Sequence, residues 1–243
     1  MRMLRFVTVF TVLALASVAA AQPAPASRGF VEGGLAYGWW LSNSDFIETS
    51  NGTALDSPGA SGPALDLTGG FAPIPGLYVI GDFQWAHAST IDGQNQDGDT
   101  DRTKLSYLSL AFGVRTTVKA GPGEVYAQLG LGVATPFETV REQDLAGGGS
   151  RTTTTGYNTG YGGRGEAGYH YAINDHLFIG GGVRVQAFAT DNVGRTRTRV
   201  DQPSGNIETD TYSTNPDAGG NTRNAQALSV QDVRFRLSVG YRF

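Results

Sequence analysis

Residues 233–243 read VRFRLSVGYRF and alternate without a break between two kinds of side chain. One parity is apolar and ends in aromatic residues: Val233, Phe235, Leu237, Val239, Tyr241 and Phe243. The other parity is cationic or small: Arg234, Arg236, Ser238, Gly240 and Arg242. Because successive side chains of a strand point to opposite faces, this stretch predicts a strand with one apolar face and one cationic face.

The same alternation recurs along the chain and predicts seven further strands: 28–41, 63–72, 77–88, 103–119, 124–137, 157–172 and 177–189. Three of their connections are short turns, at 73–76, 120–123 and 173–176. The other four are long and polar, at 42–62, 89–102, 138–156 and 190–227. Strands of this length with alternating short and long connections are typical of an up-and-down β-barrel.

The two parities indicate that the barrel spans a membrane. The polar parity consists mainly of Gly, Ala, Ser and Thr with a few charges, which suits the inside of a narrow cylinder, whereas the apolar parity is large and suits lipid. Aromatic residues gather at two levels, as expected for the two membrane interfaces. One belt contains Phe71, Tyr169, Tyr171, Tyr241 and Phe243, and the other contains Tyr37, Trp39, Phe83, Trp85, Phe137, Tyr157 and Tyr161. The sequence therefore predicts an all-β fold, an eight-stranded antiparallel transmembrane barrel.

Composition and the N-terminus narrow the class further. The chain of 243 residues has no Cys and a formal net charge of -4, which excludes disulfides and zinc-thiolate sites and argues against a nucleic-acid partner. Residues 1–21 run from basic to apolar to small, and Ala19 and Ala21 form an Ala-x-Ala cleavage site. We therefore expect residues 1–21 to be a cleaved signal peptide for Sec export, 22–27 a short periplasmic segment and 28–243 the barrel.

From about Arg28 to Phe243 the chain resembles the small eight-stranded outer-membrane barrels of the OmpA, OmpX, OmpW and opacity-protein type. The most specific likeness is the C-terminal assembly signal, in which Arg236 fits the polar place and Tyr241 and Phe243 fit the aromatic places. Ser238 stands where the family usually has Gly. The resemblance implies the outer membrane of a Gram-negative bacterium, a monomer in contact with outer-membrane lipid and lipopolysaccharide, termini in the periplasm, and recognition by the barrel-assembly machinery.

The inward parity carries charges of both signs. The acids are Glu32, Asp66, Asp82 and Glu166, and the bases are Arg115, Arg164, Arg184, Arg234, Arg236 and Arg242. An eight-stranded barrel is just wide enough for side chains to fill, and a buried charge needs a partner. We therefore expect an ion-pair network that plugs the lumen. The alternative is a narrow, weakly anion-selective channel, because the arginines outnumber the acids.

Catalytic and metal signals are weak. His87 has Ser89, Asp92 and Asp82 nearby in sequence, but the spacing matches no known signature, so we expect an interfacial polar residue and no enzyme. An outer-membrane lipid-modifying enzyme stays open as the lesser alternative. The acidic stretch 97–101 departs from the EF-hand pattern, so we expect a solvated loop, no metal and no cofactor, with a calcium site as its alternative.

Arg195, Arg197 and Arg199 alternate with Thr as a strand extension of 177–189 and share the parity of Val183 and Val185, unless Gly194 hosts a bulge that reverses the parity. This pattern predicts a cationic row above the outer aromatic belt that could contact lipopolysaccharide phosphates, with a solvated strand as the alternative. The sequence as a whole predicts a structural or surface-interaction protein that acts through long extracellular loops. A small-solute or hydrophobic-compound channel is the alternative, and no feature names a ligand.

Overall fold

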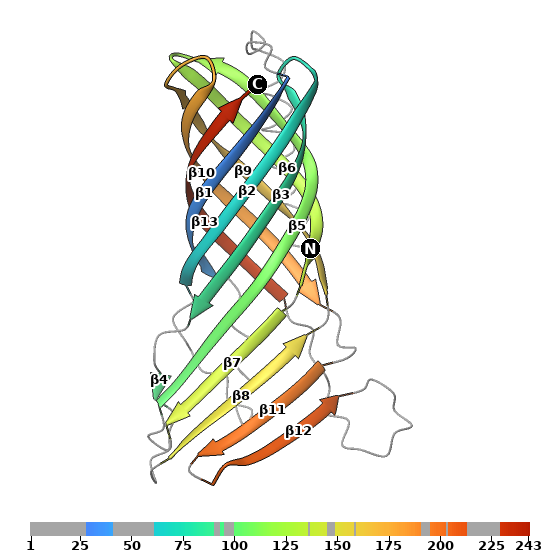
Figure 1. The fold of residues 1–243 in the computed structure, drawn as a ribbon, viewed down its shortest axis with the longest axis vertical. Helices are drawn as coiled ribbons and strands as arrows, with labels where there is room; N and C mark the ends of the chain where they lie inside the picture. Colours follow the sequence, from blue (N-terminus) through green and yellow to red (C-terminus); the bar gives the residue numbers. More distant parts are fainter. Residues whose placement is uncertain are drawn as a thin grey trace, which may run out of the picture.

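The computed structural model describes residues 28–40, 61–89, 93–94, 100–135, 137–144, 149–157, 159–190, 195–202, 204–212 and 229–243. The predicted signal peptide, residues 1–21, and the segment 22–27 lie outside the described residues, as does most of the predicted loop 42–62. The regular structure of the described part consists of β-strands (Figure 1). None of its segments is a helix long and apolar enough to cross a membrane.

Eight strands of the described chain form a closed antiparallel barrel, in the order β5–β3–β2–β1–β13–β10–β9–β6, with β6 pairing back onto β5 (Figure 1). They are β1 (Gly29–Trp40), β2 (Ser61–Ile74), β3 (Leu77–Ser89), β5 (Thr100–Ala120), β6 (Gly123–Ala134), β9 (Gly160–Ala172), β10 (Leu177–Thr190) and β13 (Ser229–Arg242). The predicted fold class and its eight strands are confirmed, with strand ends shifted by a few residues.

Short turns join the strands at one end of the barrel, which confirms the three predicted turns. Gly76 and Gly121 have φ values of +79° and +58°, in the left-handed region that glycine adopts without strain. Asn174 stabilises the third turn, because its side-chain oxygen accepts hydrogen bonds from the backbone N–H groups of His176 and Leu177. The last strand closes against the first at this end, where Gly29 and Phe243 exchange two backbone hydrogen bonds of 3.0 Å.

The wall is apolar outside and charged inside. On β13, Leu237 is 74% exposed, whereas the neighbouring Arg236 is 2% exposed. Both predicted aromatic levels have exposed members: Tyr37, Trp39, Phe83, Trp85 and Tyr161 in one, and Phe71, Tyr171, Tyr241 and Phe243 in the other. Tyr169 is half-buried and donates a hydrogen bond to the carbonyl of Ala120. The side chains of Phe137 and Tyr157 lie outside the described part. An apolar outer band between aromatic levels is the surface of a transmembrane barrel.

The prediction that 138–156 is a loop throughout is wrong, and 190–227 contains more strand than the extension expected at 195–199. The structure has strands β7 (Phe137–Asp144), β8 (Ser150–Tyr157), β11 (Arg195–Gln202) and β12 (Asn206–Tyr212) there. With the outer half of β5 they form a sheet in the order β5–β7–β8–β11–β12, which stands beyond the barrel at the end opposite the short turns (Figure 1). A two-residue strand, β4 (Gly93–Gln94), also pairs with β5. Strands outside the membrane have no lipid-facing side, so no apolar parity marks them in the sequence.

Along β5 the pairing partner changes from β6 to β7, and the register shifts by one residue at that change. Ser109 pairs with Ala134, but Ser106 pairs with Glu138, so the β6–β7 side carries one residue more than β5. A slip of one residue exchanges the two faces of a strand. The strands of the outer sheet therefore do not keep the parity of the barrel strands that they follow.

The arginine positions of β11 belong to the outer sheet, where Arg197 pairs with Thr155 of β8. The side chains of Arg195, Arg197 and Arg199 lie outside the described part, so the face that they share and their contact with lipopolysaccharide stay predictions.

Candidate functional site

The charged side chains of the inward parity gather inside the barrel. The ten residues predicted there are at most 8% exposed: Glu32, Asp66, Asp82, Arg115, Arg164, Glu166, Arg184, Arg234, Arg236 and Arg242. The structure adds two buried acids that sequence reasoning missed, Glu124 and Asp232. Both share the inward parity of their strands, and that signal could have found them. The described lumen therefore contains six carboxylates and six guanidinium groups, which we call the charged layer.

Arg184 of β10 is the centre of the charged layer, and its side chain is fully buried. Its Nε donates to Glu166 Oε2 at 2.7 Å, its Nη1 to Asp66 Oδ1 at 2.5 Å and its Nη2 to Asp82 Oδ2 at 2.9 Å. These three carboxylates come from β9, β2 and β3. A single guanidinium group therefore links strands from around the barrel.

Glu32 of β1 is a second centre of the charged layer. Its Oε1 accepts from Nη1 of Arg236 at 2.7 Å, and its Oε2 accepts from Nη1 of Arg115 at 2.8 Å. The Nε2 atom of His170 lies 3.3 Å from Oε1, and this ring stacks on Tyr126 with 4.3 Å between centroids. Strands β1, β5, β9 and β13 therefore meet at one carboxylate.

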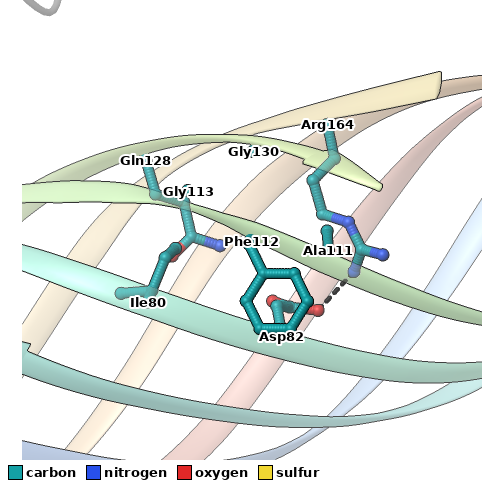
Figure 2. A pocket seen from close by; sticks show the side chains of 8 residues that line it. All are labelled: Ile80, Asp82, Ala111, Phe112, Gly113, Gln128, Gly130 and Arg164. Carbon is teal, nitrogen blue, oxygen red and sulfur yellow. Dashed lines mark hydrogen bonds and ion pairs between the residues drawn. The ribbon is translucent and has the colours of Figure 1, made fainter. Parts of the chain in front are cut away.

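Arg164 of β9 crosses the lumen to Asp82 of β3 (Figure 2). Its Nη1 donates to Asp82, and its Nη2 donates to Ser109 at 2.8 Å. Asp82, Gln128 and Arg164 line a hollow that is too small for a water molecule (Figure 2). Buried side chains therefore pack closely around this ion pair.

The remaining charges pair farther from the centre. Arg234 donates to Asp232 at 2.9 Å and belongs to a polar group that includes Tyr107 and Gln186. Arg242 donates to Glu124 at 2.9 Å, and its guanidinium group lies over the ring of Phe178. Every arginine of the charged layer thus has a carboxylate partner, as a buried charge requires.

Buried apolar residues also line the lumen toward both ends of the barrel, and sequence reasoning passed over them. Near the outer sheet lie Ala36, Trp40, Ala64, Ala86, Leu105, Tyr107, Ala134 and Phe188. Near the short turns lie Phe30, Tyr78, Ile80 and Phe178. These residues share the inward parity with the charges, so alternation alone could have placed them. They pack in the same lumen as the ion pairs: Arg242 lies over the ring of Phe178, and Asp232 pairs across the strands with Trp40.

Inward glycines make room for the large side chains opposite them. A Cβ atom on Gly34 would lie 2.9 Å from Nε of Arg236, and one on Gly240 would lie 2.1 Å from the ring of Phe178. A Cβ atom on Gly182 would lie 2.5 Å from the hydroxyl of Tyr126. Small residues opposite large ones let the interior of a narrow barrel fill completely.

The other predicted candidates do not form one site. Asp82 lies inside the barrel, whereas His87 lies on the parity of the exposed Trp85 and contacts Ser106, so Asp82 cannot belong to the alternative catalytic set with His87 and Ser89. Asp92, Asp97 and Asp99 lie outside the described residues. The described side chains include no group of three metal-binding residues.

The three residues of the predicted assembly signal lie on opposite faces of β13. Tyr241 and Phe243 are exposed outside the barrel, and Tyr241 stacks on His176 with ring centroids 5.4 Å apart. Arg236 is buried in the charged layer. The aromatic members are thus the ones that another protein could reach from outside.

The similarity of this chain to known proteins was found in the comparison with solved structures. No protein-family model and no curated protein sequence matches the chain. A major outer membrane protein from Thermus thermophilus superposes with a TM-score of 0.51 at 18% identity, over 88% of this chain and 99% of its own. The outer membrane protease OmpT from Escherichia coli has a TM-score of 0.50 at 10% identity, over 92% and 99%.

The outer membrane protein OprG from Pseudomonas aeruginosa has a TM-score of 0.49 at 16% identity, over 92% of this chain and 99% of its own. The apolar outer wall, the closed strand order and the superpositions on the Thermus protein and OmpT agree with the likeness first seen in the sequence. The chain therefore has the fold of the transmembrane antiparallel β-barrels of bacterial outer membranes.

Proposed function

We propose that this protein is an outer-membrane barrel with a closed lumen, which serves as an anchor for its outer sheet. In this proposal the barrel is a monomer, the short turns lie in the periplasm, and the sheet β7–β8–β11–β12 stands outside the cell as an interaction surface. The observation that carries the proposal is the buried network of ion pairs around Arg184 and Glu32, with buried apolar residues on either side of it along the lumen. A protein that conducts solutes needs a continuous aqueous path, and the buried side chains of the described lumen support a closed one.

Charge balance weakens the alternative of an anion-selective channel. That alternative rested on an excess of arginines over acids. With Glu124 and Asp232 included, the described lumen has six groups of each sign, and the arginines are held by carboxylates. An anion that entered would have to displace a buried carboxylate from its partner, which is costly.

Planar-bilayer recording of the purified, refolded protein tests the closed lumen. The wild type should show no conductance steps. Replacing Arg184 and Arg236 together by Ala removes both side chains that donate to Glu166 from β10 and β13, and we expect steps to appear. Conductance steps in the wild type would overturn the proposal.

The matched control is Lys104→Ala, which removes a cation from a partly exposed pair outside the lumen. This variant should show no conductance steps. Steps in this control would show that the recording reports damage to the wall and not an opened lumen.

The outer sheet supports the surface-interaction part of the proposal. It extends five neighbouring strands beyond the barrel, counting the outer half of β5, and its central strand carries the run 152–155 of threonines. The arginine positions 195, 197 and 199 belong to this sheet through β11. We keep lipopolysaccharide phosphates as the proposed ligand of those arginines.

A further inference from the structure

A histidine and a serine face each other on the outer side of the wall. His87 of β3 and Ser106 of β5 are direct cross-strand neighbours, and Nδ1 of His87 lies 2.8 Å from Oγ of Ser106. When the imidazole proton is on Nε2, the serine hydroxyl donates to Nδ1. A serine that donates to an imidazole nitrogen is the arrangement of a nucleophile and its general base.

The pair lies on the membrane side of the wall. His87 lies on the same face of β3 as Trp85, and Ser106 lies on the same face of β5 as Leu108. Trp85 is 47% exposed and Leu108 is 37% exposed. Toward the outer sheet, this face of β5 carries first the apolar Leu108, then the hydroxyl of Ser106 and then the cation of Lys104. This order of polarity is the one that a strand follows as it leaves hydrocarbon for headgroups.

The height of the pair agrees with that placement. His87 stands ten residues beyond Leu77, the first residue of β3. At about 3.3 Å per residue and a tilt of about 40°, this distance is about 25 Å along the membrane normal, the height of the apolar band. The pair therefore reaches the depth at which lipid ester bonds meet the headgroups.

A cation stands next to the pair. Lys104 is one same-face position beyond Ser106, about 7 Å along the strand, and its Nζ binds Glu142 at 2.6 Å. An ammonium group at this level suits a lipid phosphate. The ion pairs of the lumen do not involve His87 or Ser106, so the closed barrel does not account for their contact.

We propose that Ser106 and His87 form a hydrolytic dyad that cleaves acyl esters of membrane lipids. This proposal rests on the membrane placement proposed above. The hydroxyl of Ser106 attacks the ester carbonyl carbon as its proton passes to Nδ1 of His87. The ester C–O bond then breaks, the leaving alcohol oxygen takes that proton, and the acyl group stays on Oγ.

Water completes the reaction. His87 takes a proton from a water molecule, whose oxygen attacks the acyl-serine, and the proton returns to Oγ of Ser106 as the fatty acid leaves. Ester and water thus become acid and alcohol with no oxidant, metal or other co-reactant. Ser106 and His87 both touch the reacting atoms and are the catalytic residues of the proposal.

The test uses the full protein refolded into vesicles of phosphatidylethanolamine and phosphatidylglycerol, and separately with lipopolysaccharide. Released fatty acid is measured by mass spectrometry, so the two arms identify the lipid that supplies the ester. We expect release by the wild type, none by Ser106→Ala, and a decrease of about 10²- to 10⁴-fold in His87→Ala. Ser89→Ala, two residues from His87 on the same strand face, is the matched control and should keep full activity.

A second readout does not depend on turnover. A fluorophosphonate probe should form an adduct on Ser106 of the folded wild type, and His87→Ala should slow that labelling. Absence of both fatty-acid release and adduct in the inserted wild type overturns the dyad. Loss of activity in Ser89→Ala with activity kept in Ser106→Ala also overturns it. Protease protection in the vesicles reports insertion separately, so a failure there counts against the proposed function instead.

Discussion

At the scale of single residues, the lumen depends on a few arginines that each hold several carboxylates. Arg184 alone contacts Asp66, Asp82 and Glu166. These carboxylates are buried as well, so none can turn to water if the guanidinium group is removed. The energy of such a cluster lies less in making the pairs than in the cost of leaving one member unpaired.

We expect Arg184→Met to lower the free energy of unfolding by about 3–5 kcal/mol, because it leaves buried carboxylates without their central partner. The matched control, Lys104→Met, breaks a partly exposed pair and should cost less than about 1 kcal/mol. Urea unfolding of the two refolded variants in the same vesicles measures both. Equal midpoints would contradict the assigned role of Arg184.

At the scale of elements, β13 combines two tasks on its two faces. Its inward arginines join the charged layer, whereas Tyr241 and Phe243 face outward. The backbone of Phe243 closes the barrel onto Gly29 through two hydrogen bonds. Those bonds do not need the phenyl ring, so closure of the barrel and recognition of the strand can be separated.

We expect Phe243→Ala to refold in vitro with stability within about 0.5 kcal/mol of the wild type, since the ring is 64% exposed and its backbone bonds remain. In cells the amount of protein in the outer membrane should fall. Phe112→Ala is the control, because Phe112 is another outward phenylalanine with 65% exposure. Immunoblots of outer-membrane fractions compare them, and an equal loss in both would remove the evidence for an assembly signal.

At the scale of the whole molecule, the distribution of side chains is inverted relative to a soluble protein. Apolar residues cover the wall outside and charges fill it inside. Adjacent residues show this inversion directly, because Trp39 is 47% exposed and Trp40 is 3% exposed. One step along β1 therefore crosses from the outer surface to the lumen.

Brominated lipids test this inversion. A protein with Trp39 as its sole tryptophan, made by Trp40→Phe and Trp85→Phe, should lose fluorescence in vesicles of brominated lipid. A protein with Trp40 alone should not, because the wall separates its ring from the acyl chains. Equal quenching of the two proteins would show that the barrel does not sit in the bilayer as its outer surface indicates.

Sequence reasoning succeeded for features that depend on a single strand. Alternation located the barrel strands and placed the arginines and acids on the inward side, because parity is a property of neighbouring residues. It failed for β7, β8 and β12, which lack a lipid-facing side, whereas the alternation of Arg with Thr at 195–199 indicated the strand that is β11. It also missed the contact of His87 with Ser106, since these residues meet only when β3 pairs with β5.

The sequence by itself determined the alternation that makes each barrel strand two-faced. Only the tertiary structure decided which charges meet: Glu32 binds Arg236, which is 204 positions away, because closure brings β13 beside β1. It also decided where the pairing partner of β5 changes from β6 to β7, and with it the register of the outer sheet. The physical reason is that parity is set between adjacent residues, whereas partners and register depend on how separate strands align.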